Sequence, residues 1–162
     1  MSVIVTSHTG PLGVLTLVGR EGALAGIYFP AHKPGGPPAA AKPGSSPALE
    51  AARKQLDQYF AGRRKTFDVP LALAGTAFQM RVWAGLAKLG FGETISYGAL
   101  AQRLASAAAV RAVAGAVARN PVSIVIPCHR VIGADGKLTG FAGGIDRKRA
   151  LLGLEQGGAL EL

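Results

Sequence analysis

The sequence contains a single cysteine, Cys128. One cysteine cannot form an internal disulfide, and it supplies no CxxC pair for a metal. No run of about eighteen uncharged apolar residues is present, so a membrane-spanning helix is not expected. The first residues, MSVIVTSHTGPLG, lack a basic segment followed by an apolar one, and therefore do not resemble a secretion signal. Together these absences predict a protein of the reducing cytoplasm.

Acidic residues are also scarce. Nine Asp and Glu stand against eighteen Lys and Arg, which gives a formal net charge of +9. Such a balance favours a polyanionic partner, of which nucleic acid is the commonest. Basic clusters occur in both halves of the chain, at Arg63-Arg64-Lys65 and at Arg147-Lys148-Arg149. Because many basic proteins bind no polyanion, charge alone leaves nucleic-acid binding open.

The first half of the chain predicts strands followed by a helix. Apolar and polar residues alternate over the first thirty positions, with Gly and Pro between the runs, as in short antiparallel strands. Residues 32–47 are rich in Pro, Gly and Ala and predict a mobile loop. A helix is expected next, with Ser46 as its N-cap and Pro47 in its first turn. The segment FDVPLAL, residues 67–73, predicts another strand.

From Thr76 onward the pattern becomes helical. Thr76 is a candidate N-cap for a helix that Gly90 should end. Ser96 should begin a short helix, and Ser106 a second one that Asn120-Pro121 terminates. Two short helices joined by a tight turn, the second exposed and basic, indicate a helix-turn-helix unit.

The last part of the chain predicts a wing. Residues 124–126 form a short apolar run that favours a strand, and Asp135-Gly136 is a strong hairpin-turn pair in the stretch after it. Asp146 should then cap a final helix. The sequence thus predicts an α/β N-terminal domain over residues 1–72, with a small antiparallel sheet plus a helix. A mainly α winged helix-turn-helix domain is expected over residues 76–157.

The segment IVIPCHRVIG carries the strongest chemical signal. A thiol becomes a good nucleophile as the thiolate, which a base or nearby positive charge favours. His129 could act as the base for Cys128, and Arg130 could contribute positive charge. Adjacent residues on an extended chain point to opposite faces, so adjacency does not establish contact. From this segment alone, a reactive cysteine and a buried structural cysteine are equally supported.

The sequence around PCHR resembles the O6-alkylguanine-DNA alkyltransferases, also called methylated-DNA–protein-cysteine methyltransferases. The resemblance rests on FQMRVWAGLAKLGFGETISYGALA, RAVAGAVARNP, NPVSIVIPCHRVIG and GKLTGFAGGIDRKRALLGLE, in the family's order and spacing. It covers residues 76–156, and the N-terminal stretch SHTGPLGVLTL looks like the family's more variable first domain. The resemblance implies direct-reversal DNA repair: irreversible, stoichiometric transfer of an alkyl group from O6-alkylguanine to the protein itself. It leaves activity on O4-alkylthymine open.

The resemblance also implies a role for each matching residue. Cys128 would accept the alkyl group, and His129 would deprotonate it through a water. Glu155 would orient the imidazole, which generalises the nucleophile–base–orienter arrangement. Asn120 would hold the backbone turn near the thiol, and Tyr97 would donate a hydrogen bond or proton to the departing base. Taken singly, each of these residues also has an ordinary structural explanation.

The family inserts its helix-turn-helix into the minor groove and flips the damaged nucleotide into a pocket. Helix 107–118 is mostly Ala, Gly and Val, which gives a slim surface for a narrow groove. Arg111 matches the arginine that fills the space of the flipped base, and Ala112 and Tyr97 match neighbouring DNA contacts. A solvated surface charge is the alternative for Arg111.

Val131, Phe141 and Ala142 match residues that line the guanine pocket, and Trp83 matches one near it. Many relatives have Tyr where Phe141 stands, so a hydrogen bond from this position is in doubt. For Trp83 and Phe141 the alternative is ordinary core packing, which for Trp83 is at least as well supported.

Some relatives hold structural zinc on N-terminal Cys and His residues. This chain has only His8 and His32 there, so the sequence predicts no zinc and no other cofactor.

The expected partner is double-stranded DNA carrying O6-alkylguanine, bound by a monomer with no obligate protein partner. Two other hypotheses remain: a module that recognises damage without reacting, and a cysteine hydrolase using Cys128, His129 and Glu155.

Overall fold

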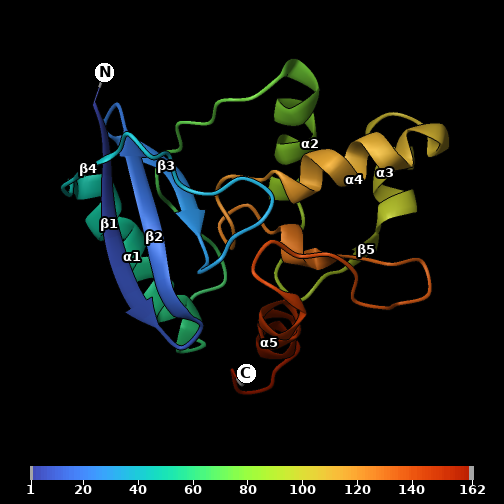
Figure 1. Cartoon of the computed structure of the whole chain (residues 1–162). Coiled ribbons are helices and arrows are strands. Elements are labelled where there is room, and N and C mark those ends of the chain that lie inside the picture. The colour runs from blue at the N-terminus through green and yellow to red at the C-terminus, as the bar shows by residue number, and fades with distance from the viewer. Residues whose placement is uncertain (1, 161–162) are drawn as a thin grey trace.

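The computed structural model describes residues 2–160, and Figure 1 shows two halves lying side by side. A sheet with one helix forms the N-terminal half, and four further helices gather in the C-terminal half. The division agrees with the predicted α/β domain followed by a mainly helical domain.

Three strands form the antiparallel part of the sheet, as the alternating pattern predicted. They are β1 (Val3–Gly10), β2 (Gly13–Arg20) and β3 (Ala23–Tyr28), paired in the order β3-β2-β1. A short fourth strand, β4 (Lys42–Pro43), lies parallel to β1 at the other edge. Residues 32–47 were predicted to be loop throughout; the structure corrects this because the end of that segment joins the sheet.

Helix α1 (Pro47–Phe60) begins where its capping signals predicted. The Ser46 side chain accepts a hydrogen bond from the Leu49 backbone N–H at 3.3 Å, and proline occupies the first turn. Leu49 and Leu56 are fully buried, so one face of the helix covers the sheet.

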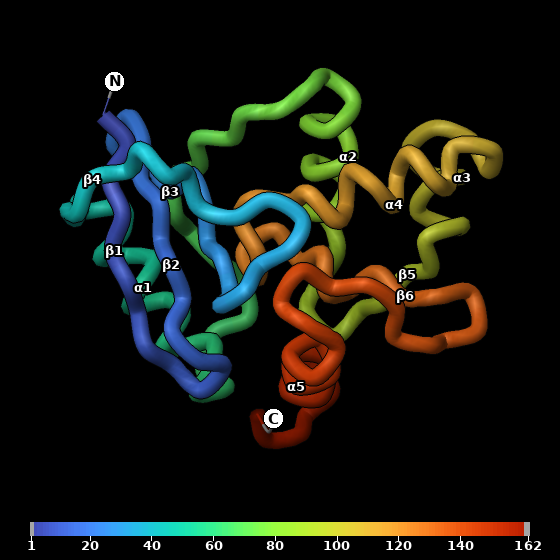
Figure 2. Tube along the Cα trace, viewed as in Figure 1, coloured from blue at the N-terminus to red at the C-terminus, as the bar shows by residue number. Residues whose placement is uncertain are grey.

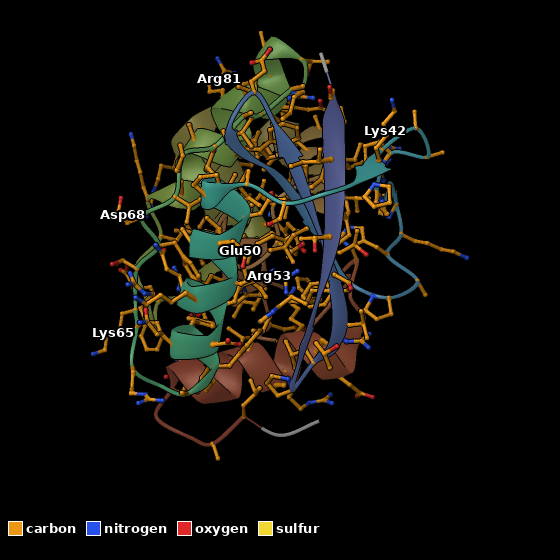
Figure 3. All side chains as sticks on the ribbon, turned by 90° about the vertical axis from the view of Figure 1, so that its left-hand side faces the viewer. Lys42, Glu50, Arg53, Lys65, Asp68 and Arg81 are labelled. Atoms are coloured by element: carbon orange, nitrogen blue, oxygen red, sulfur yellow. The ribbon has the colours of Figure 1, made fainter. Side chains whose placement is uncertain are left out.

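Figure 3 shows α1 lying across the sheet beside β1, with Glu50 and Arg53 labelled on the helix. These two side chains form an exposed ion pair with an N–O distance of 3.3 Å. Arg53 also donates a hydrogen bond to the Thr6 hydroxyl of β1. The polar face of α1 is therefore tied to β1, in addition to the packing of its apolar face on the sheet.

The prediction of a regular strand over residues 67–73 was wrong. Only one bridge forms, between Leu24 and Leu71. The Leu24 N–H donates to the Pro70 carbonyl at 2.8 Å, and the Ala72 N–H donates to the Leu24 carbonyl at 2.9 Å. Proline has no N–H to extend a ladder, which explains why this segment stays an isolated bridge.

Helix α2 (Ala77–Ala87) has the cap that Thr76 predicted. Its hydroxyl accepts from the Gln79 N–H at 3.1 Å, and the Gln79 side chain accepts from the Thr76 N–H at 3.0 Å. This reciprocal pair is a capping box. The helix ends at Ala87, earlier than the predicted stop at Gly90.

The helix-turn-helix consists of α3 (Tyr97–Leu104) and α4 (Val110–Ala118), joined through a 3-10 turn at Ala107–Ala109. Ser96 caps α3 by accepting from the Ala99 N–H at 3.0 Å. Ser106 begins the second unit as predicted, although its side chain makes no capping hydrogen bond.

The predicted strand over residues 124–126 was also wrong, because the chain turns there. Ile124 has a φ of 75°, and the Ile126 N–H donates back to the Val122 carbonyl at 2.9 Å. A short 3-10 helix, η2 (Cys128–Arg130), follows. Next, β6 (Val131–Ile132) pairs in parallel with β5 (Ile95–Ser96).

The predicted hairpin wing is a turn without a strand pair. In the described part of the chain β6 is the last strand, and the Gly133 N–H donates to the Lys137 carbonyl at 2.8 Å. The carbonyls of Thr139 and Gly140 accept hydrogen bonds from Lys148, at 2.9 and 3.5 Å. Backbone groups that would have formed a ladder therefore bind a side chain instead.

Helix α5 (Ile145–Glu155) closes the fold (Figure 1). Gly144, with a φ of 92°, is its N-cap, so the prediction that Asp146 caps it was wrong. Asp146 lies in the first turn and pairs with Arg149 at 3.2 Å. No helix among residues 2–160 is long and apolar enough to cross a membrane.

The two halves share one hydrophobic core and are joined by backbone hydrogen bonds. The Ile27 N–H of β3 donates to the Pro121 carbonyl at 2.9 Å, beside a bridge between Ile27 and Val122. Arg147 of α5 donates to the Leu12 carbonyl at 2.7 Å. These contacts fix the sheet domain against the segment that leads into Cys128.

Candidate active site around Cys128

Cys128 lies at the start of η2, 7% exposed, at the wall of a cavity of about 510 Å³. Besides Cys128 itself, residues from four segments line this cavity. They come from the loop after β3, the start of α3, the end of α4 with the turn after it, and the stretch before α5: Lys33, Pro34, Tyr97, Ala114, Val117, Ala118, Asn120, Ser123, Cys128, Thr139, Gly140, Phe141 and Ala142. Figure 2 shows the loop after β3, in light blue, reaching toward the C-terminal half.

Asn120 holds the turn that leads into the cysteine. Its side-chain amide donates to the Ile126 carbonyl at 2.7 Å and its side-chain oxygen accepts from the Val122 N–H at 3.0 Å. The Cys128 N–H donates to the same Ile126 carbonyl at 2.8 Å. Because Asn120 is 2% exposed, water does not compete for these bonds. The thiol is thereby placed by a turn, not by the end of a strand.

A buried cluster of charged side chains lies directly behind the cysteine. His129 Nε2 lies 2.7 Å from Glu155 Oε2, with both side chains fully buried. Arg130 donates from Nε to Glu155 Oε1 at 2.7 Å and from Nη2 to Oε2 at 2.9 Å. Its Nη1 donates to the Leu89 carbonyl at 2.6 Å. Such a two-pronged arginine–carboxylate pair is the strong form of the interaction.

Glu155 carries the negative charge of this cluster. Burial alone would raise the pKa of its carboxyl, but hydrogen bonds from His129 and Arg130 outweigh burial and hold the pKa well below its usual value. The carboxylate therefore stays ionised throughout the neutral range.

His129 is held as a neutral imidazole. Burial lowers its pKa from the ordinary 6.5 in spite of the Glu155 charge, and the positive charges of Arg130 and Lys148 lower it further. A carboxylate can only accept, so Nε2 carries the ring proton and Nδ1 is the bare nitrogen. Within residues 2–160 the buried Nδ1 has no hydrogen-bond partner. The ring thus keeps a free basic nitrogen next to the cysteine in sequence.

Burial raises the pKa of the Cys128 thiol above its ordinary 9.0. Asn120, Lys148 and Ser123 act in the opposite direction without reversing the shift. The resting protein therefore holds a neutral thiol, and nucleophilic attack by Sγ requires a base at the moment of attack.

Lys148 of α5 is a residue that the sequence interpretation missed. It is fully buried, and its Nζ lies 5.7 Å from the centre of the Tyr97 ring. Burial lowers its pKa, while the charge of a Cys128 thiolate would raise it. The sequence analysis identified it only as part of the basic cluster Arg147-Lys148-Arg149. Its spacing from Leu151 and Glu155 places it on the buried face of α5, which was the available signal.

The structure brings most of the predicted site residues together. Tyr97, Phe141 and Ala142 line the cavity beside Cys128, and Asn120 contributes to its wall. His129 and Glu155 meet behind it. Phe141 also packs against Phe29 of the first domain, with ring centres 5.4 Å apart.

Two predicted pocket residues do not line the cavity. Trp83 is 2% exposed, and its Nε1 donates to the Ala116 carbonyl at 2.8 Å, which agrees with the core-packing alternative. Val131 is fully buried in β6. Arg111 and Ala112 are exposed at the start of α4 and do not line the cavity either.

Comparison with known proteins gives matches over both halves of the chain. The family model described as "6-O-methylguanine DNA methyltransferase, DNA binding domain" matches residues 77–157. The model described as "6-O-methylguanine DNA methyltransferase, ribonuclease-like domain" matches residues 4–73.

Individual relatives agree with the family models. The methylated-DNA–protein-cysteine methyltransferase of Mycobacterium tuberculosis is 47% identical over 148 residues, 90% of this chain and 88% of that protein. The protein of the same name from Haemophilus influenzae is 40% identical over 93% of this chain and 85% of its own length. Among solved structures, Mycobacterium tuberculosis OGT in complex with DNA superposes with a TM-score of 0.89 and 43% identity, covering 99% of this chain and 96% of that one. The chain therefore belongs to the 6-O-methylguanine DNA methyltransferase family.

Proposed function

We propose that this protein repairs DNA directly, by transferring an alkyl group from O6 of guanine to the Sγ atom of Cys128. The observation that best supports this proposal is the arrangement of the site. One cysteine lies at the wall of a cavity, and a neutral histidine and an ionised carboxylate lie behind it. The cavity volume of about 510 Å³ is within the range of small-molecule sites. The names of the relatives in the family support the same reaction.

In the proposed reaction, His129 Nδ1 takes the thiol proton through a water as Sγ attacks the alkyl carbon in line. The carbon–sulfur bond forms while the bond from that carbon to guanine O6 breaks. Guanine leaves with the electron pair, and Tyr97 donates a hydrogen bond or proton to it. The product is S-alkylcysteine and unmodified guanine, and each chain reacts once.

The surrounding charges have distinct parts in this step. Glu155 accepts the Nε2 hydrogen bond, which directs Nδ1 away from the carboxylate and stabilises the imidazolium formed on proton transfer. The Lys148 ammonium stabilises negative charge as it develops on Sγ, since the two groups interact electrostatically. Asn120 keeps the turn, and hence the thiol, in place.

DNA is the proposed partner, bound through α4 by a monomer. The exposed side of α4 carries Arg111, Ala112, Gly115 and Ala118, so its surface is slim apart from one long cation. Such a surface suits a narrow minor groove, with Arg111 taking the place of the flipped nucleotide. This substrate would place the protein with the cell's DNA.

The direct test is the intact mass of the reduced protein after incubation with a short duplex containing O6-methylguanine. The expected result is a gain of one methyl per chain, mapped to Cys128 and saturating at that value. No gain, with DNA binding intact, would indicate a damage-recognition module. Many methyl groups removed per chain would contradict self-alkylation.

The rate of methyl transfer should be nearly independent of pH over a plateau. At saturating DNA, the single-turnover rate constant should fall at acid pH as His129 protonates, with a midpoint below 6.5, because the His129 pKa is lowered. It should stay flat up to the raised pKa of the Cys128 thiol, above 9.0. A rate that instead climbs about tenfold per pH unit through neutrality would mean that a preformed thiolate reacts and His129 is not the base. Rapid quenching followed by mass measurement gives the profile.

A further inference from the structure

One residue of the sheet domain contacts the catalytic carboxylate directly. Tyr59, near the end of α1, is fully buried, and its hydroxyl donates a hydrogen bond to Glu155 Oε2. The two residues are 96 positions apart in sequence and lie in different halves of the fold. Tyr59 belongs to the buried face of α1, together with Leu49 and Leu56.

The position of the Tyr59 hydroxyl is fixed by packing on its ring. The ring centre lies 5.4 Å from that of Phe67 and 6.2 Å from that of Phe91. Phe60 packs edge-on at 5.7 Å. Burial and the nearby Glu155 charge raise the pKa of Tyr59 far above its usual value, so the phenol remains a donor at every working pH.

Tyr59 binds the same carboxylate oxygen that orients His129. Glu155 Oε2 accepts from Tyr59, from His129 Nε2 at 2.7 Å and from Arg130 Nη2 at 2.9 Å. Without the phenol, Oε2 would accept one hydrogen bond fewer and would interact more strongly with its remaining donors, His129 and Arg130. That would raise the proton affinity of His129. The carboxylate would lose one of its anchors and be held mainly by Arg130, so that it could shift with the imidazole attached to it.

We propose that Tyr59 is a positioning residue for alkyl transfer, acting through Glu155 on the orientation and basicity of His129. The inference rests on the proposed function and gives the sheet domain a part in the reaction. A helix of one domain completes the hydrogen-bond shell of a carboxylate in the other, so the reactive arrangement requires both domains to be docked.

The test is Tyr59→Phe, which removes the hydroxyl and keeps the ring. The single-turnover rate constant for methyl transfer should fall about tenfold, the effect of one charge-assisted hydrogen bond. The acid limb of the pH profile should move to higher pH, since a more basic His129 is protonated earlier. Affinity for the O6-methylguanine duplex should be unchanged, because Tyr59 lies away from α4.

Phe67→Leu is the matched control. It removes one of the three rings that pack on Tyr59, while Phe60 and Phe91 still hold the phenol and its hydroxyl against Glu155. The variant therefore reports what partial loss of packing does when the hydrogen bond is kept. It should lower the melting temperature while the acid limb stays at the wild-type pH. Both variants are assayed well below the lower melting temperature.

Three outcomes would overturn the inference. One is a Tyr59→Phe protein with the wild-type rate and profile, and another is the same shift of the acid limb in Phe67→Leu. The third is a Tyr59→Phe protein that does not fold even when cold, because Tyr59 would then be structural. If the wild-type protein itself gains no methyl in the same experiment, the proposed function fails, and the two failures are thereby distinguished.

Discussion

Replacing Cys128 by alanine should abolish methyl transfer and leave binding of damaged DNA intact. Cys128 is the only cysteine of the chain, so no second thiol can accept the group. The rate should fall by at least about a thousandfold, as when other catalytic nucleophiles are removed. The side chain is small and does not lie on the exposed face of α4, so the fold and the DNA interface should persist. Intact-protein mass and a gel-shift titration with the O6-methylguanine duplex measure the two effects.

The two readouts together separate the functions that the sequence left open. A protein that only recognises damage would behave alike with cysteine or alanine at position 128, in mass and in binding. A cysteine hydrolase would gain no methyl group from the duplex in either form and would show no preference for the O6-methylguanine duplex. A methyl group found on Cys128→Ala would place the acceptor elsewhere and contradict the proposed reaction.

Local signals in the sequence were sufficient for most helix starts. Ser46, Thr76 and Ser96 each accept the capping hydrogen bond expected of them, because a cap depends on residues within one turn. The order of elements and the identity of the reactive segment also followed from sequence, the latter through resemblance to a family.

Two of the errors have a common physical cause, which is a side chain outside the segment that binds its backbone carbonyls. The run at residues 124–126 has the composition of a strand, yet the buried Asn120 side chain takes the carbonyl of Ile126 and closes a turn. The stretch after Gly133 has a hairpin-turn pair, yet Lys148 of the last helix takes the carbonyls of Thr139 and Gly140. Local propensity contains no information about such side chains.

The candidate site was also only partly predictable, because some of its residues come from distant parts of the sequence. Cys128 and His129 are contiguous and could be read together, whereas Lys148, Tyr59 and Lys33 reach the site from α5, α1 and the loop after β3. Of these three residues, only Lys148 could have been inferred from the sequence, because its spacing from Leu151 places it on the buried face of α5. The contributions of the sheet domain became visible only when the two halves were placed together.

Glu155→Gln should be the most damaging substitution for stability among the site residues. It leaves the buried Arg130 guanidinium without its counter-charge, a change that typically costs about 3–5 kcal/mol of unfolding free energy. Transfer should also slow by at least about a hundredfold, because an amide neither fixes the His129 ring as firmly nor stabilises an imidazolium. Urea unfolding at neutral pH and single-turnover mass assays measure the two losses.

The pH dependence of stability identifies the carboxylate as the cause. The Glu155 pKa is depressed in the folded protein, so its stabilising contribution is fully present above the unfolded value of about 4.5 and is lost as pH falls toward the folded value. The stability difference between wild type and Glu155→Gln should therefore be constant from pH 7 to about pH 5 and shrink as the pH falls from there to 3. Glu50→Gln is the control: its side chain is 60% exposed and pairs with Arg53 on the surface, so it should change stability by less than about 1 kcal/mol. If Glu155→Gln were as mild as Glu50→Gln, the buried cluster would not be the ionic network described above.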